Sequence, residues 1–119
     1  MPERQDFAAI QYLYLTTTGR KTGLPREIEI WFVHHAGRFY LLAEHFHRTQ
    51  WVQNIAANPR VSVRVADRQF TATARVLDEA RDATLYQLAQ QLECEKYDWG
   101  DGLPVEITPD EFEPVTSNG

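Results

Sequence analysis

Alternating hydrophobic and polar positions predict that much of this chain is β-strand. In one such run Val61, Val63 and Val65 alternate with polar residues, as expected of a strand with one buried face. Pro104 places the last predicted strand at the edge of its sheet, because proline has no N–H to donate to a neighbouring strand. The predicted strands are residues 10–18, 27–35, 39–43, 61–65, 70–77 and 103–107.

Two helices are predicted between these strands. Thr49 is the expected N-cap of a short helix that ends at Asn58, and Asp78 is the expected cap of a longer one. The buried stripe of the longer helix is predicted to be Leu85, Leu88, Ala89 and Leu92. Because hairpins rather than helices join nearly all the strands, the pattern indicates an α+β, mainly β fold. We expect a six-stranded antiparallel barrel with two or three helices covering its gaps.

The length of 119 residues fits a single domain with a modest core. Residues 1–8 are expected to form a loose arm or short helix, and residues 109–119 a flexible tail. No run approaches the ~20 apolar residues of a membrane helix, and the first residues lack the form of a signal peptide. The single cysteine, Cys94, excludes an intrachain disulfide and is interpreted as structural. A cytoplasmic location is therefore expected.

Charge is distributed unevenly along the chain. Ten Lys/Arg and six Asp/Glu lie in residues 1–75, whereas two and eleven follow, so the two parts carry +4 and −9 and the whole −5. An acidic protein is a poor candidate for general nucleic-acid binding, which depends on neutralising phosphates. Local positive charge in the first part fits a small anionic ligand better, and the acidic second part is compatible with a solvated face.

The positive charge is concentrated in residues 16–26, which contain four threonines, two glycines and three cations between two predicted strands. Hydroxyls, backbone N–H groups freed by a glycine turn, and the side chains of Arg20, Lys21 and Arg26 can all contact an anionic oxygen. Two interpretations remain open from composition alone: a phosphate-binding turn, or an ordinary basic hairpin loop. Neither a Walker loop nor a dinucleotide fingerprint fits the glycine spacing.

Three ordered motifs resemble segments of the deazaflavin-dependent nitroreductase family. They are residues 15–26 (LTTTGRKTGLPR), 51–61 (WVQNIAANPRV) and 97–102 (YDWGDG), and the similarity extends over about residues 13–108. This resemblance implies a split β-barrel related to the pyridoxamine-phosphate oxidase group. It also implies a homodimer, which is common in this group, and the deazaflavin coenzyme F420 as hydride carrier.

The resemblance also implies which residues contact the coenzyme. The candidates for its phosphate are Arg20, Lys21, Thr22 and Arg26, with Thr18 added from the hydroxyl-rich turn. The candidates for its ring are Ile30, Trp31, Ala43, Glu44 and Trp51. Trp31, Trp51 and Trp99 would then wall a flat-ring pocket, although tryptophan is more often a core or interface residue.

Hydride transfer from a deazaflavin needs no protein nucleophile, and the chain has no plausible catalytic triad. The candidates for a proton donor are His45, His47 and Tyr97, and for each histidine a solvated surface position is the alternative. His45 and His47 would share one face of a continued strand, but nothing has the spacing of a structural zinc site, so no metal is predicted.

The expected function is an F420-dependent oxidoreductase acting on a small quinone, nitro or enone-like acceptor. Two alternatives stay open: a reductase of the same fold that uses FMN, or a barrel that binds a flavin-like or haem-like ligand without catalysis. Phe46 and Glu29 favour the last alternative, because bulk and negative charge at these positions depart from the family pattern.

Overall fold

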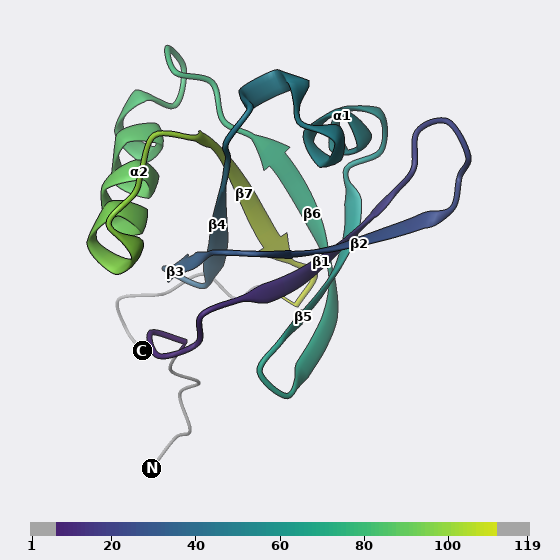
Figure 1. Cartoon of the computed structure of the whole chain (residues 1–119), viewed down its shortest axis with the longest axis horizontal. Coiled ribbons are helices and arrows are strands. Elements are labelled where there is room, and N and C mark those ends of the chain that lie inside the picture. Colours follow the sequence, from purple (N-terminus) through teal and green to yellow (C-terminus); the bar gives the residue numbers. More distant parts are fainter. Residues whose placement is uncertain (1–6, 112–119) are drawn as a thin grey trace.

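Seven antiparallel strands form one curled sheet in the computed structural model, which describes residues 7–111 (Figure 1). The strands are β1 (Leu13–Thr18), β2 (Pro25–Ile30), β3 (Val33–His35), β4 (Arg38–Ala43), β5 (Arg60–Val65), β6 (Arg68–Val76) and β7 (Leu103–Pro109). Their spatial order is β2-β1-β5-β6-β7-β4-β3. The helical elements are η1 (Phe46–Arg48), α1 (Gln50–Ala57) and α2 (Ala83–Tyr97). The predicted mainly β antiparallel barrel class is confirmed.

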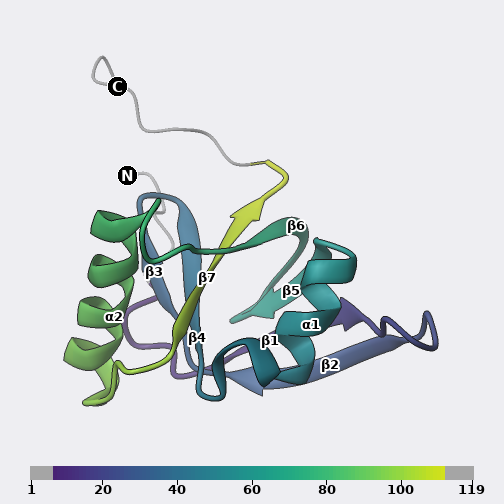
Figure 2. The ribbon, with the colours of Figure 1, turned by 90° about the horizontal axis from the view of Figure 1, so that it is seen from above.

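The core lies inside the curl, where one face of each long strand meets the others. In β5 the valines at 61, 63 and 65 are buried while Arg60 and Arg64 are exposed, which confirms the predicted alternation. Other core residues on the sheet include Leu13, Leu15, Leu41, Ala72, Val105 and Ile107. Figures 1 and 2 show α1 beside β1 and β6, and α2 along β3 and β4 on the other side of the sheet.

The prediction of one continuous strand over residues 27–35 is wrong, since the chain bends between β2 and β3. β2 pairs with β1 whereas β3 pairs with β4, so the chain changes its partner strand at this point. Phe32 packs into the main core, and Val33 packs on the other face with Tyr40 and Ala89. Tyr97 holds the bend: its ring stacks on Trp31 at 4.4 Å between centroids, and its hydroxyl bonds the backbone N–H and carbonyl of Phe32 at 3.1 and 2.9 Å.

The edge position predicted for the strand with Pro104 is also wrong, because β7 lies between β6 and β4. The N–H and C=O of a strand residue point to the same side, and the Pro104 carbonyl accepts a hydrogen bond from Leu77. The β6 ladder ends at Val76, opposite Val105. The missing proline N–H therefore faces the end of β6, where its cost to the sheet is small.

The longer helix begins later than expected and buries a different stripe. Asp82, rather than Asp78, occupies its N-cap position, because the Asp78 carboxylate accepts the N–H groups of the turn residues Ala80 and Arg81. The buried residues of α2 are Tyr86, Ala89 and Glu93, whereas the three predicted leucines are half-buried. Thr49 and Asn58 bound α1 as predicted.

Two ends of the described chain are held more firmly than predicted. Phe7, in the expected loose arm, is buried in the core. Asp110, in the expected tail, pairs with Arg60 at 2.6 Å and also accepts a hydrogen bond from Thr71. The remainder of both predictions, residues 1–6 and 112–119, lies outside the described residues. Among residues 7–111, no helix has the length and apolar character needed to cross a membrane.

Candidate functional site

Two cavities adjoin at Trp51. The first, which we call the cationic cavity, has a volume of about 390 Å³ and is lined by Arg20, Lys21, Arg26 and Trp51 among others. The second, which we call the tryptophan cavity, has a volume of about 600 Å³. Trp31, Trp51 and Trp99 all line it, so the expectation that the three tryptophans wall one pocket is confirmed. Because they share a residue, the cavities can accept two parts of one ligand.

The turn between β1 and β2 shapes the cationic cavity. The Gly19 N–H donates to the Leu24 carbonyl and the Gly23 N–H to the Gly19 carbonyl, each at 2.8 Å. Gly23 has a φ of 74°, which side chains disfavour. A Cβ added to Gly19 would lie 2.9 Å from the Thr22 hydroxyl and 3.2 Å from the Leu24 carbonyl. Both glycines are therefore needed for this tight turn.

Arg20 fixes the turn to α1 instead of standing free. Its guanidinium donates to the Asn54 side-chain oxygen and to the Gln50 side-chain oxygen, each at 2.9 Å. Asn54 is buried, and its amide donates to the Thr17 hydroxyl at 3.1 Å. These contacts join the two motifs far apart in sequence. We did not predict Asn54 or Gln50, although both lie in or beside the second motif.

Lys21 and Arg26 are the cations that remain available for a ligand. Both are exposed and line the cationic cavity, and among residues 7–111 neither makes an ion pair or a hydrogen bond. The Thr22 hydroxyl lies beside them and accepts the Leu24 N–H at 3.2 Å. An anion entering the cavity would thus find two unpaired cations.

Four predicted site residues lie outside the lining of both cavities. Thr18 lines a separate depression, whereas Thr17 lines both that depression and the cationic cavity. Ala43 is buried in the core, between the cavity residues Leu42 and Glu44. In both cases the side chain of the preceding residue lines the cavity, because successive side chains of a strand point to opposite faces. The other two residues are His47 and Tyr97.

Tyr97 has a structural position in this fold. Besides holding the bend at Phe32, its hydroxyl lies 2.8 Å from the Gln11 carbonyl. Burial raises the pKa of this phenol to about 12. The His47 carbonyl accepts a hydrogen bond from Gln53, and its imidazole is exposed. Of the three predicted proton donors, only His45 lines the tryptophan cavity.

The remaining lining of the tryptophan cavity mixes apolar and acidic side chains. Ile30 and Leu42 contribute apolar surface, and Glu29 and Glu44 contribute negative charge. Glu29 is exposed and accepts a hydrogen bond from the Tyr14 hydroxyl at 3.2 Å. No cluster of three or more metal-ligating side chains occurs in residues 7–111.

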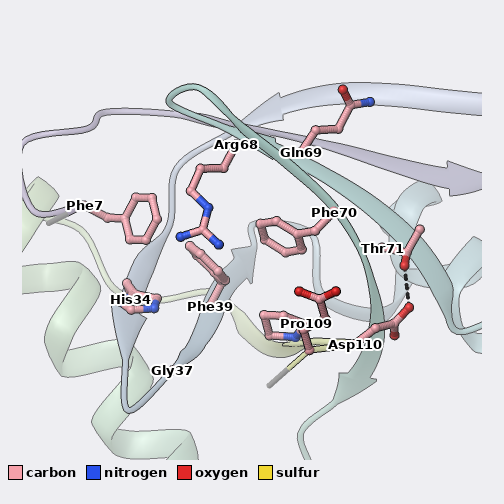
Figure 3. Close-up of a pocket in the computed structure, with 11 residues that line it drawn as sticks. Phe7, His34, Gly37, Phe39, Arg68, Gln69, Phe70, Thr71, Pro109 and Asp110 are labelled. Atoms are coloured by element: carbon pink, nitrogen blue, oxygen red, sulfur yellow. Dashed lines mark hydrogen bonds between the residues drawn. The ribbon is translucent and has the colours of Figure 1, made fainter. Parts of the chain in front are cut away.

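A third cavity, of about 550 Å³, lies away from these motifs (Figure 3). Phe7, Phe39 and Phe70 form much of its wall, and the Arg68 side chain reaches between them (Figure 3). Burial lowers the pKa of His34 there, with help from the charges of His35 and Arg68. Arg68 is the one Lys or Arg side chain in the described lining of this cavity, which also contains Asp110 and Glu111, so the two cavities at Trp51 form the better candidate site for an anionic ligand.

The bridge through Asn54 leads to a first prediction. Asn54→Ala should destabilise the chain by about 1–3 kcal/mol, because it removes the partner of the buried Thr17 hydroxyl and one of the two side-chain acceptors of the Arg20 guanidinium. Urea denaturation measures this change. Gln53→Ala is the matched control, since Gln53 makes one exposed hydrogen bond to the His47 carbonyl. Equal stability of the Asn54 variant and the control would contradict the bridging role.

Comparison with known proteins identifies relatives with the same architecture. Residues 2–108 match the family model described as F420H(2)-dependent quinone reductase. A solved structure of an F420-H2 dependent reductase (FDR-A) is 28% identical, with a TM-score of 0.58, covering 81% of this chain and 91% of that one.

Two further structures are similar in fold alone. The haem storage protein HutZ from Vibrio cholerae is 19% identical, with a TM-score of 0.69, covering 87% of this chain and 84% of that one. A putative pyridoxamine 5'-phosphate oxidase from Listeria innocua is 16% identical, with a TM-score of 0.63 and 90% coverage of both chains. The expected split-barrel fold is confirmed.

Proposed function

Since this chain belongs to the F420H2-dependent quinone reductase family, we propose that it passes a hydride from reduced F420 to a small quinone-type acceptor. The observation that carries the proposal is the meeting of the two cavities at Trp51. A coenzyme with an anionic tail and a flat ring needs a cationic pocket beside an aromatic one. The residues present fit that requirement, and the bound coenzyme would supply the hydride.

Lys21, Arg26 and Thr22 would hold the coenzyme's phosphate, because they line the cationic cavity and the two cations have no partner among the described residues. Arg20 would act mainly by fixing the turn through Asn54. Ile30, Trp31 and Trp51 would contact the ring, with Glu44 beside them. We no longer assign ligand contacts to Thr18 and Ala43, since neither lines the two cavities.

His45 is the proposed side chain for delivering a proton to the acceptor. It lines the tryptophan cavity and is exposed, so it can exchange protons with water. His47 and Tyr97 are less suitable, because neither reaches the cavity lining and the Tyr97 hydroxyl is bound to backbone. A quinone is preferred over a nitro or enone acceptor because the family is described by that reaction.

A coenzyme titration followed by tryptophan fluorescence tests the proposal. F420 should change the emission strongly, because three tryptophans line one cavity. When reduced F420 and menadione are then supplied together, the absorbance of F420 should report turnover. Tight FMN binding without F420 binding would favour the FMN alternative, and no response to either would refute the coenzyme site.

The homodimer and the cytoplasmic location remain proposals. Exposed apolar side chains at Tyr12, Leu24 and Phe46 support an association surface near the site. Analytical ultracentrifugation of the purified chain tests the dimer, which predicts twice the mass of 13.8 kDa.

A further inference from the structure

Two polar side chains of the tryptophan cavity have no hydrogen-bond partner in the described part of the chain. Neither carboxyl oxygen of Glu93 is paired within residues 7–111, and the same holds for the hydroxyl of Thr49. Glu93 is fully buried, and both residues belong to the lining of this cavity. Buried polar atoms in proteins are nearly always paired. Two unpaired groups at one cavity therefore indicate that a ligand completes their hydrogen bonding.

The Thr49 hydroxyl is unpaired although the residue stands where a hydroxyl usually caps a helix. Its side chain makes no capping bond to α1, while its carbonyl accepts the Gln53 N–H at 3.1 Å. The usual partner of an N-cap threonine is a backbone N–H of the first turn. The hydroxyl is therefore left for another partner in the cavity.

Glu93 lies on the buried stripe of α2, one turn before Lys96. The Lys96 ammonium donates to the Phe32 carbonyl at 3.0 Å and lies 4.0 Å from the centre of the Phe32 ring, so it is already engaged. Burial raises the pKa of Glu93 to about 8, although the charge of Lys96 opposes the rise. At neutral pH the carboxyl group is thus mainly protonated and can donate a hydrogen bond. The other titratable groups facing it or the cavity are Tyr12, Glu29, Glu44, His45 and, on α2, Tyr97.

We propose that Glu93 and Thr49 bind the carbonyl oxygen of an uncharged, flat acceptor of the quinone class, which deepens the function proposed above and rests on it. Two donors suit a carbonyl oxygen, Trp31 and Trp99 offer flat aromatic walls, and Leu42 adds apolar surface. Glu29 and Glu44 disfavour an anionic acceptor by repulsion. The Glu93 oxygens and the Thr49 hydroxyl all lie beneath the cavity surface, so binding includes a change of both side chains' torsions that exchanges unpaired groups for paired ones.

Menadione, an uncharged naphthoquinone, serves as the probe in the absence of coenzyme, and tryptophan fluorescence reports its binding. Glu93→Leu should raise its Kd about tenfold, and Thr49→Val several-fold, since each removes a donor. Glu93→Gln keeps an N–H donor and should bind within about threefold of the unaltered chain. Glu95→Leu, an exposed acid on the same helix, is the control and should change little.

The pH dependence adds a second readout. Menadione binding to the unaltered chain should weaken as the pH rises past about 8, where Glu93 loses its proton. Binding to Glu93→Gln should stay constant over the same range. If menadione binding to Glu93→Gln weakened with pH as it does in the unaltered chain, another of the groups named above would cause the change, and the role of Glu93 would be overturned.

The outcomes separate this inference from the proposed function. Equal menadione affinity of Glu93→Leu and the unaltered chain, or no menadione binding at all, would overturn it. If Glu93→Leu weakened F420 binding but left menadione binding unchanged, the inference would also be overturned, because the two groups would then contact the coenzyme ring. Failure of the unaltered chain to bind F420 would refute the proposed function alone. Thermal unfolding checks each variant's fold, and Glu93→Leu should fold because it removes an unpaired buried acid.

Discussion

Replacing Lys21 and Arg26 together by alanine is expected to weaken F420 binding by at least about 100-fold. Hydrogen bonds to charged groups contribute about 1.5–3 kcal/mol each, and 1.4 kcal/mol corresponds to a tenfold change in Kd. Both cations line the cationic cavity and are unpaired within the described residues, so their loss costs the fold little. The effect should therefore appear in binding and not in stability.

Tryptophan fluorescence at fixed ionic strength measures the affinity, and urea denaturation checks that the variant is folded. Arg68→Ala is the matched control: it removes an exposed cation from the third cavity, away from the motifs. The control should bind F420 with nearly unchanged affinity. If the double variant bound as tightly as the control, the phosphate would have to lie elsewhere.

The local parts of this fold were predictable because short-range patterns determine them. Val61, Val63 and Val65 alternate over one strand, and the residues between Gly19 and Gly23 form the expected turn. The break after Ile30 was not predictable, since the change of partner strand from β1 to β4 depends on the arrangement of the whole sheet. The contact of Tyr97 with Phe32, 65 positions away, stabilises the break.

The central position of β7 was missed for a related reason. A proline in a strand usually marks an edge, but the rule concerns which hydrogen bond is lost. Pro104 lies just past the end of the β6 ladder. The position at which β6 ends depends on the whole sheet, so the sequence around Pro104 does not predict it.

The candidate site was predictable in its motifs but less so in its individual side chains. The cationic turn and the three tryptophans come together as expected. Choosing Thr17 over Thr18, or Leu42 over Ala43, depends on strand register, because a shift of one residue reverses the face. Asn54 and Glu93 were missed because a polar residue on a helix is ordinarily solvent-exposed.

Glu93 is expected to make stability depend on pH. Its pKa rises from 4.5 to about 8 on folding, chiefly through burial. Below pH 4.5 the carboxyl group is protonated in both states and imposes no penalty. Between the two values the unfolded chain releases the proton that the folded chain retains, so raising the pH favours unfolding. At 1.36 kcal/mol for each pKa unit, the loss is at most roughly 5 kcal/mol and is complete above the folded value.

Guanidinium denaturation at pH 5 and at pH 8.5 compares the free energies of unfolding. Glu93→Gln should remove most of the difference, because an amide does not titrate, and the variant should therefore be more stable than the unaltered chain at the higher pH. Glu95→Gln is the control, since Glu95 is exposed on the same helix and bonds Gln91 at 3.1 Å. It should keep the original pH dependence. If the free energy of unfolding changed equally between the two pH values in Glu93→Gln and in the unaltered chain, Glu93 would be charged in the folded state. A charged carboxylate at that position would in turn require a cation or donor to approach it, and Lys96 is the residue that would have to leave the Phe32 carbonyl to do so.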